Sequence, residues 1–104
     1  MNIMLCCSAG LSTSIVCSKM RKYSEENGLG DKIWATSLQQ AKDEMSTADI
    51  VLIGPHMRAM GKTVAELAEK LNVPCMIIDQ MDYAYGNAKA VYTKMQKVLE
   101  NKKG

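Results

Sequence analysis

The 104-residue sequence lacks several features that would place it in a common functional class. Its apolar runs, such as 50–53 and 76–78, are far shorter than the ~20 residues that cross a bilayer. Thirteen basic and eleven acidic side chains nearly balance, without a long block of either sign. The single histidine and the dispersed cysteines have no zinc-ligand spacing. We therefore expect no nucleic-acid partner, no direct membrane insertion, no metal and no organic cofactor.

The beginning of the sequence also lacks the charged start of a signal peptide, which predicts a cytoplasmic protein. Disulfides are rare in that compartment, so the four cysteines are expected to be reduced thiols. Cys17 and Cys75 fall within an expected helix and an expected strand, where buried, unreactive thiols are usual. Cys6 and Cys7 are adjacent at the end of the first apolar run, and either is a candidate nucleophile by composition.

Four short apolar runs predict strands, and helical periodicities separate them. This alternation predicts a single α/β domain over residues 1–104, with a four-stranded parallel sheet, right-handed crossovers and helices on both faces. The run 50–53 is apolar on both sides and fits a central strand, whereas 32–36 is mixed and fits an edge. The expected strands, numbered 1 to 4 along the chain, are Ile3–Cys6, Ile33–Thr36, Ile50–Ile53 and Cys75–Ile78. We expect their order in the sheet to be 2-1-3-4.

Each expected helix carries an apolar stripe. In the third helix the stripe is Met60, Val64, Leu67 and Leu71, which the helical spacing places on one face against the sheet. The other stripes are Val16, Met20 and Tyr23 in a helix over 12–27 that Gly28 and Gly30 end; Leu38, Ala41 and Met45, with Ser37 and Gln40 as a capping box; and Ala88, Val91, Tyr92, Met95, Val98 and Leu99.

In this strand order the chain leaves strands 1 and 3 in opposite directions, and ligands bind outside the carboxyl ends of the strands at such a point. The two loops there are 7–14 and 54–59. Cys7 stands at the beginning of the following helix, where the positive dipole end stabilises a thiolate and also cradles phosphate oxygens. Small residues and hydroxyl groups follow it. On residue pattern alone, a capped turn with an inert Cys7 remains the alternative.

The sequence lacks a residue that each of three known kinds of cysteine or aspartate site requires. A tyrosine-phosphatase loop, Cys-x5-Arg, would place arginine where Thr13 stands, which removes the bidentate clamp on the phosphoryl group. Asp79 and Asp82 follow strand 4 but are also typical of loop caps. A thioredoxin-like site needs Cys-x-x-Cys, and a receiver domain needs a carboxylate where Gly54 stands. These three functions are therefore disfavoured.

The segment "CSAGLSTS", residues 7–14, resembles the loop after strand 1 in the lactose/cellobiose-type enzyme IIB component of the phosphoenolpyruvate-dependent sugar phosphotransferase system. It matches the family pattern Cys-Ser-Ala-Gly-x-Ser-Thr-Ser at every fixed position. The segments "ADIVLIGPHMRAM", 48–60, and "IDQMDYAYGN", 78–87, are similar to the family's third strand and to the stretch after its fourth. The resemblance implies a fold similar to that of low-molecular-weight tyrosine phosphatases.

The resemblance also implies a phosphoryl carrier. Cys7 would attack the phosphohistidine of a IIA protein, hold the group as phosphocysteine, and pass it to a disaccharide of the cellobiose, chitobiose or lactose type in the membrane protein IIC. This is the activity of a protein-Nπ-phosphohistidine–sugar phosphotransferase, carried out in the cytoplasm and transiently at the inner membrane face. A carrier must protect its phosphoryl group from water, which suits the missing arginine. The implied phosphate-binding loop is Ser8, Ala9, Gly10, Leu11, Ser12, Thr13 and Ser14.

Two other functions stay open, namely a small cysteine-dependent phosphatase and a non-catalytic regulatory docking domain. The family register selects Cys7 over Cys6, whose side chain we expect to turn into the core.

Residues of the other loops form an expected rim around the site. His56, Arg58 and Tyr83 are candidates for positioning phosphate or contacting a partner, although a lone histidine in a Gly-Pro turn is more often a plain surface residue. Met57 and Met60 are expected at the same rim. Tyr83 and Tyr85 either contact a partner near the crevice or pack against the last helix.

Overall fold

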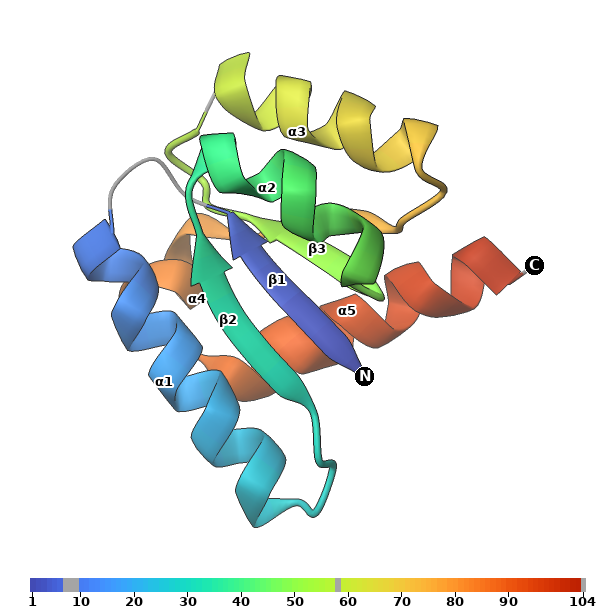
Figure 1. Ribbon diagram of the computed structural model, residues 1–104. Helices are drawn as coiled ribbons and strands as arrows, with labels where there is room; N and C mark the ends of the chain where they lie inside the picture. Colours follow the sequence, from blue (N-terminus) through green and yellow to red (C-terminus); the bar gives the residue numbers. More distant parts are fainter. Residues whose placement is uncertain (7–9, 58, 104) are drawn as a thin grey trace.

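The computed structural model describes residues 1–6, 10–57 and 59–103, and only the backbone of 10–14, 38–39, 59 and 102–103 (Figure 1). The elements, in chain order, are β1 (Asn2–Cys6), α1 (Gly10–Glu26), β2 (Lys32–Thr36), α2 (Leu38–Glu44), the 3-10 helix η1 (Met45–Thr47), β3 (Ile50–Ile53), α3 (Ala59–Lys70), β4 (Cys75–Ile77), α4 (Gln80–Tyr85) and α5 (Ala88–Lys103).

The four strands form one parallel sheet in the order β2-β1-β3-β4, which confirms the predicted topology. In the central strand β1, Met4 is paired with Trp34 of β2 on one side and with Val51 of β3 on the other. All four residues of β3 are buried, as the two-sided apolar run predicts, whereas exposed and buried residues mix along the edge strand β2. The expected strand boundaries are correct to within one residue.

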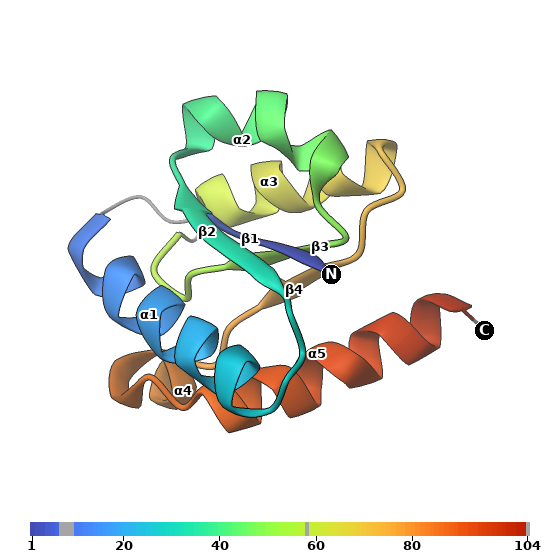
Figure 2. The same ribbon diagram turned by 60° about the horizontal axis from the view of Figure 1, so that its bottom comes forward.

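The sheet lies between two helical layers (Figure 2). α1, α4 and α5 cover one face, and α2 and α3 cover the other. Alternate residues of β1 supply the two cores, because successive side chains of a strand point to opposite faces. Ile3 and Leu5 pack in the core formed with α1 and α5, and Met4 and Cys6 pack in the core formed with α2 and α3. The predicted helices on both faces are therefore confirmed.

The buried face of α3 differs from the prediction. Val64 is fully buried, but Met60 is 41% exposed and Leu71 is 46% exposed. The helix instead turns small residues toward the sheet, with Gly61 and Ala68 buried beside Val64. A Cβ atom added at Gly61 would lie 3.1 Å from a methyl carbon of Ile53. The start of α3 therefore packs closely on β3, and the larger Met60 side chain is left outside.

The stripes predicted for the other helices are buried where their side chains are described. They are Val16, Met20, Ala41, Met45, Ala88, Val91, Tyr92 and Met95, with Tyr23, Val98 and Leu99 partly buried. The capping box of α2 is only half formed. The Ser37 side chain accepts a hydrogen bond from the Gln40 backbone N–H, at 3.4 Å. The Gln40 side chain does not complete the box, because its Oε1 accepts a hydrogen bond from the Thr36 hydroxyl instead.

The short helix α4 was not predicted, because it has no apolar stripe of useful length. Polar groups define both of its ends. The Asp79 carboxylate accepts a hydrogen bond from the Met81 backbone N–H, at 2.9 Å, and Gly86 ends the helix in the left-handed conformation, with φ of 61°. Asp-to-Gly spacing of this kind is a recognisable start and stop signal. α4 follows β4 and so lies at the carboxyl edge of the sheet, where the candidate site is expected.

Candidate active site

The carboxyl ends of three neighbouring strands are tied together by backbone hydrogen bonds. The Gly54 N–H donates to the Cys6 carbonyl, at 3.0 Å, and the Ile78 N–H donates to the Ile53 carbonyl, at 2.8 Å. β1, β3 and β4 therefore end side by side, and the loops after them begin from fixed points. Cys6 is buried with its side chain in the core, as predicted.

The candidate nucleophile Cys7 lies outside the described residues, together with Ser8 and Ala9 of the predicted phosphate-binding loop. Gly10, Leu11, Ser12, Thr13 and Ser14 form the first part of α1, and their side chains also lie outside the description. The described part of the chain thus frames the loop between the buried end of β1 and the N-terminus of a 17-residue helix. The first turn of that helix contains no acidic residue, so no carboxylate of that turn occupies the positive end of its dipole.

Two of the other cysteines are poor nucleophiles for a physical reason. Burial raises the pKa of the Cys75 thiol to about 11. Burial also raises the pKa of the Cys17 thiol, although the charge of Arg21 lowers it in part. The Cys17 Sγ is 3.8 Å from the Ile33 carbonyl oxygen, inside the core. Both thiols are therefore protonated at neutral pH, as expected for structural cysteines.

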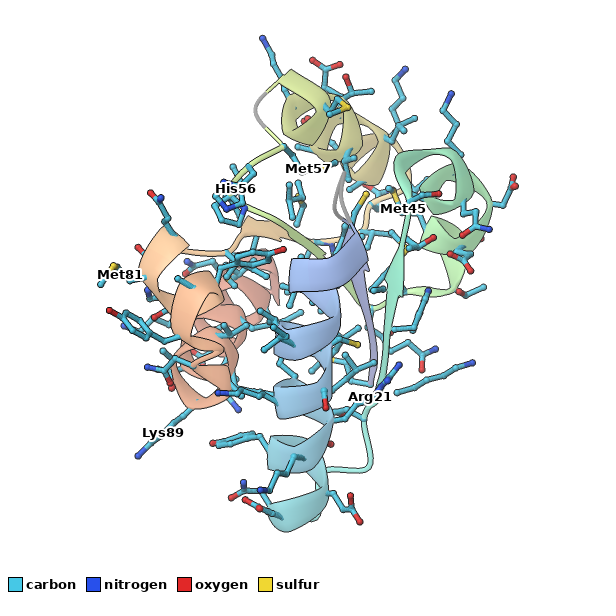
Figure 3. The ribbon with its side chains drawn as sticks, turned by 90° about the vertical axis from the view of Figure 1, so that its left-hand side faces the viewer. Arg21, Met45, His56, Met57, Met81 and Lys89 are labelled. Carbon is cyan, nitrogen blue, oxygen red and sulfur yellow. The ribbon has the colours of Figure 1, made fainter. Side chains whose placement is uncertain are left out.

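His56 and Tyr83, two of the three predicted rim residues, lie against each other. Their ring centroids are 5.6 Å apart with the rings nearly perpendicular, an edge-to-face contact. His56 is exposed in the turn between β3 and α3, while Tyr83 of α4 is only 6% exposed and packs in the core beside Val91 of α5. Figure 3 shows His56 between the beginning of α3 and α4. Arg58, the third rim candidate, lies outside the described residues.

A cavity of about 280 Å³ opens beside this aromatic pair. It brings together three separate segments, and the described residues that line it are Ile15, His56, Gln80, Tyr83 and Ala84. Sequence reasoning found His56 and Tyr83 but missed the other three. Recognition of α4 from its two caps would have pointed to Gln80 and Ala84, which lie on that helix.

Two further expectations for the rim are settled by burial. Met57 is only 1% exposed and packs in the core with Met4, Cys6 and Ile53, so its placement at the rim was wrong. The turn after β3 folds back onto the sheet here, since the Met57 N–H donates to the Gly54 carbonyl. Tyr85 is 69% exposed and does not pack in the core against the last helix.

Asp79 and Asp82 both have structural partners. Asp79 caps α4, and the Asp82 carboxylate accepts a charged hydrogen bond from Lys94 of α5, at 2.7 Å. This bond to Asp82 raises the pKa of Lys94. Both carboxylates therefore hold α4 in place, which explains their presence without a role as general acid.

No group of three or more His, Cys, Asp or Glu side chains in the described part of the chain is arranged to hold a metal ion. Among the helices over 10–57 and 59–103, none combines the length and the apolar character needed to cross a membrane.

The sheet order, and the helix that begins directly after the first loop, are those of solved sugar phosphotransferase IIB domains. The lactose-specific IIB domain of Streptococcus pneumoniae superimposes with a TM-score of 0.79 over 92% of this chain and 95% of that domain, at 13% sequence identity. The cellobiose-specific IIB component of Borrelia burgdorferi superimposes with a TM-score of 0.82 over 98% of this chain and 94% of that protein, at 29% identity.

The sequence itself shows the family. Residues 2–101 match the family model described as "PTS system, Lactose/Cellobiose specific IIB subunit", and the chain belongs to this family. A curated relative, the oligo-beta-mannoside-specific EIIB component of Bacillus subtilis (strain 168), is 35% identical over 99 residues, which cover 95% of this chain and 96% of the relative.

Proposed function

We propose that residues 1–104 form one phosphoryl-carrier domain with Cys7 as its nucleophile. The Cys7 thiolate attacks the phosphorus of a phosphohistidine on IIA, the N–P bond breaks, and the imidazole leaves. The resulting phosphocysteine then gives its phosphoryl group to a sugar hydroxyl in the membrane protein IIC, and the S–P bond breaks. The chain thus acts as a protein-Nπ-phosphohistidine–sugar phosphotransferase on the cytoplasmic face of the membrane.

The observation that carries this proposal is the sequence "CSAGLSTS", which follows the buried end of β1 and continues into the first part of α1. A helix N-terminus presents backbone N–H groups without intrahelical partners, and these stabilise a thiolate or a bound phosphate. Backbone amides of the segment 8–14 and the hydroxyls of its serines and threonine are the groups proposed to hold the phosphoryl group.

A lasting phosphoenzyme fits this site better than hydrolysis. Position 13 holds threonine where the phosphatase loop has arginine, so the bidentate clamp on the transition state is missing. Asp79 and Asp82, the carboxylates after β4, are engaged in capping α4 and in binding Lys94. The site therefore offers phosphate binding without an evident general acid for a water reaction.

The acceptor is proposed to be a disaccharide of the cellobiose, chitobiose or lactose type. The relatives' names do not agree on one sugar, since one is specific for an oligo-β-mannoside, one for lactose and one for cellobiose, so the proposal names a class and not a single sugar. His56, Arg58 and Tyr83 are proposed to contribute to the rim that the two partners contact in turn.

The test is the intact mass of the chain after incubation with phosphoenolpyruvate, the general phosphotransfer proteins and a lactose/cellobiose-type IIA. We expect one added phosphoryl group on the wild type and on Cys6→Ser, and none on Cys7→Ser. Because Cys6 is buried, circular dichroism must first show that Cys6→Ser is folded. Labelling of Cys7→Ser would contradict the assignment. Hydrolysis of an aryl phosphate by the chain alone would favour the phosphatase.

A further inference from the structure

The sheet has an edge strand on each side, β2 and β4, and the two edges differ in kind. An edge strand offers unpaired backbone N–H and C=O groups, which invite a strand of another molecule. β4 is only three residues long and follows Pro74, which has no N–H to donate. β2 is five residues long and contains no proline. The β2 edge therefore needs another kind of protection.

Alternate residues of β2 turn their backbone groups away from the sheet. The Lys32 N–H donates to the Met1 carbonyl, just before β1, at 2.9 Å. Along a parallel strand, successive residues direct their N–H and C=O groups to opposite sides. Because Lys32 faces β1, Ile33 and Ala35 turn their backbone groups outward. Ala35 is also exposed, so a second strand has access to this part of the edge.

Arg21 of α1 occupies one of these outward groups. Its Nε donates to the Ile33 carbonyl oxygen, at 2.8 Å, and the Cys17 Sγ lies 3.8 Å from the same oxygen. Figure 3 shows the Arg21 side chain beside β2. A hydrogen bond from a charged donor is stronger than one between neutral groups. The Ile33 carbonyl is therefore engaged within the chain and has a positive charge beside it.

A second positive charge lies on the same edge. The Lys32 Nζ is 5.6 Å from the centroid of the Trp34 ring, a cation–π contact that holds the ammonium group along β2. Lys32 and Arg21 are both exposed. Charged side chains on an edge strand, lysine above all, oppose the addition of another strand.

A second copy of this chain is the partner that these contacts oppose most. Two identical edges pair antiparallel about a two-fold axis, and with the axis at Trp34, Ile33 of one copy faces Ala35 of the other. Each such pair needs the Ile33 carbonyl as an acceptor, and Arg21 already binds it. The axis would also bring the positive side chains of both copies together. A strand of another protein with acidic residues would meet no such repulsion.

We propose that Arg21 closes the β2 edge against a second copy of this chain, and that loss of Arg21 lets two copies join their sheets through β2. The inference rests on the fold and is independent of the chemistry proposed for Cys7. Its signature is self-association that depends on the donor at position 21 and on the outward backbone groups of β2.

Sedimentation equilibrium with a reducing agent, which excludes disulfide-linked dimers, measures this self-association. Arg21→Met removes the donor and keeps the apolar stem, and Arg21→Lys restores a charged donor. Lys22→Met is the matched control, because Lys22 is the exposed neighbour and its ion pair is with Glu26 on the same helix. We expect Arg21→Met to form a dimer at least about tenfold tighter than any formed by the wild type, Arg21→Lys or Lys22→Met.

A second substitution tests whether the dimer uses β2. Adding Ala35→Pro to Arg21→Met removes the outward N–H, and proline is tolerated on an edge strand at a position that does not donate to the ladder. We expect this double variant to return to the monomer. Circular dichroism first checks that each variant is folded, and Arg21→Gln takes the place of Arg21→Met if the latter is not.

Three results would overturn the inference. The first is a folded Arg21→Met that self-associates no more tightly than Lys22→Met. The second is a dimer that persists when Ala35→Pro is added, because it would use another surface. The third is a wild-type dimer that Ala35→Pro dissociates, because the β2 edge would then be open in the presence of Arg21.

Discussion

Gly86 provides the sharpest test of how α4 is held, because two separate costs meet at this residue. Its φ of 61° lies in the left-handed region, where a residue with a Cβ atom costs roughly 1–2 kcal/mol. An added Cβ would also come within 2.5 Å of the Lys19 Cδ. Lys19 is a flexible side chain and moves aside, but it then gives up its hydrogen bond to the Tyr85 carbonyl.

The expected magnitudes follow from these two terms. A typical hydrogen bond contributes about 0.5–1.5 kcal/mol, and this exposed one is expected at the low end. Gly86→Ala should therefore lower the free energy of unfolding by about 1.5–2.5 kcal/mol, and Lys19→Ala alone by about 0.5 kcal/mol. In the Lys19→Ala background, Gly86→Ala should cost only the backbone term of roughly 1–2 kcal/mol, because nothing is left to displace.

Urea unfolding of the four proteins of this double-mutant cycle measures both terms. The midpoint gives the change in stability as long as the slope stays constant across the series. A cost below about 0.5 kcal/mol for Gly86→Ala in both backgrounds would refute the left-handed cap. A cost that is equal in both backgrounds would refute the contact with Lys19 and leave the cap intact.

Two further predictions test other contacts of the fold. Lys94→Gln should lower the free energy of unfolding at neutral pH, and this difference from the wild type should vanish in strong alkali. The hydrogen bond to Asp82 raises the pKa of Lys94 above 10.5, so the contribution of the ion pair to stability is complete below that pH and is lost as the pH rises through the folded-state pKa. Urea titrations at neutral and alkaline pH check this, and a constant difference would contradict it. Met57→Ala should cost about 2–5 kcal/mol and Met60→Ala within about 0.5 kcal/mol, because only Met57 is buried; similar thermal shifts for the two would return Met57 to the rim.

The sheet was predictable because its signal is local and strong. The run Ile50–Ile53 is apolar on both sides, and only a central strand of a two-faced sheet buries such a run. The buried face of α3 was not predictable from apolar spacing alone, because Gly61 carries no hydrophobic signal and yet faces the sheet. Large residues were expected inside, whereas close packing of the helix on β3 favours the smallest one.

The candidate site was also predictable only in part. Cys7 and its loop were proposed from the family motif and stay a prediction, and the structure describes the two elements that frame them. The cavity was missed because its walls come from α1, from the turn after β3 and from α4, three segments whose proximity no single window of sequence contains. His56 and Tyr83 were proposed as separate rim residues, and their contact follows only from the folded chain.

α4 is attached mostly through polar groups at its ends and side, while the two cores are built by other elements. Tyr83 is the main residue that links it to a core. Substitutions at its outward positions, such as Met81, Ala84 and Tyr85, thus leave the main packing of the sheet intact. The architecture does not depend on one particular sequence, since the S. pneumoniae domain keeps the fold at 13% identity. A small peripheral helix of this kind can change its outer surface while the sheet and its two cores stay as they are.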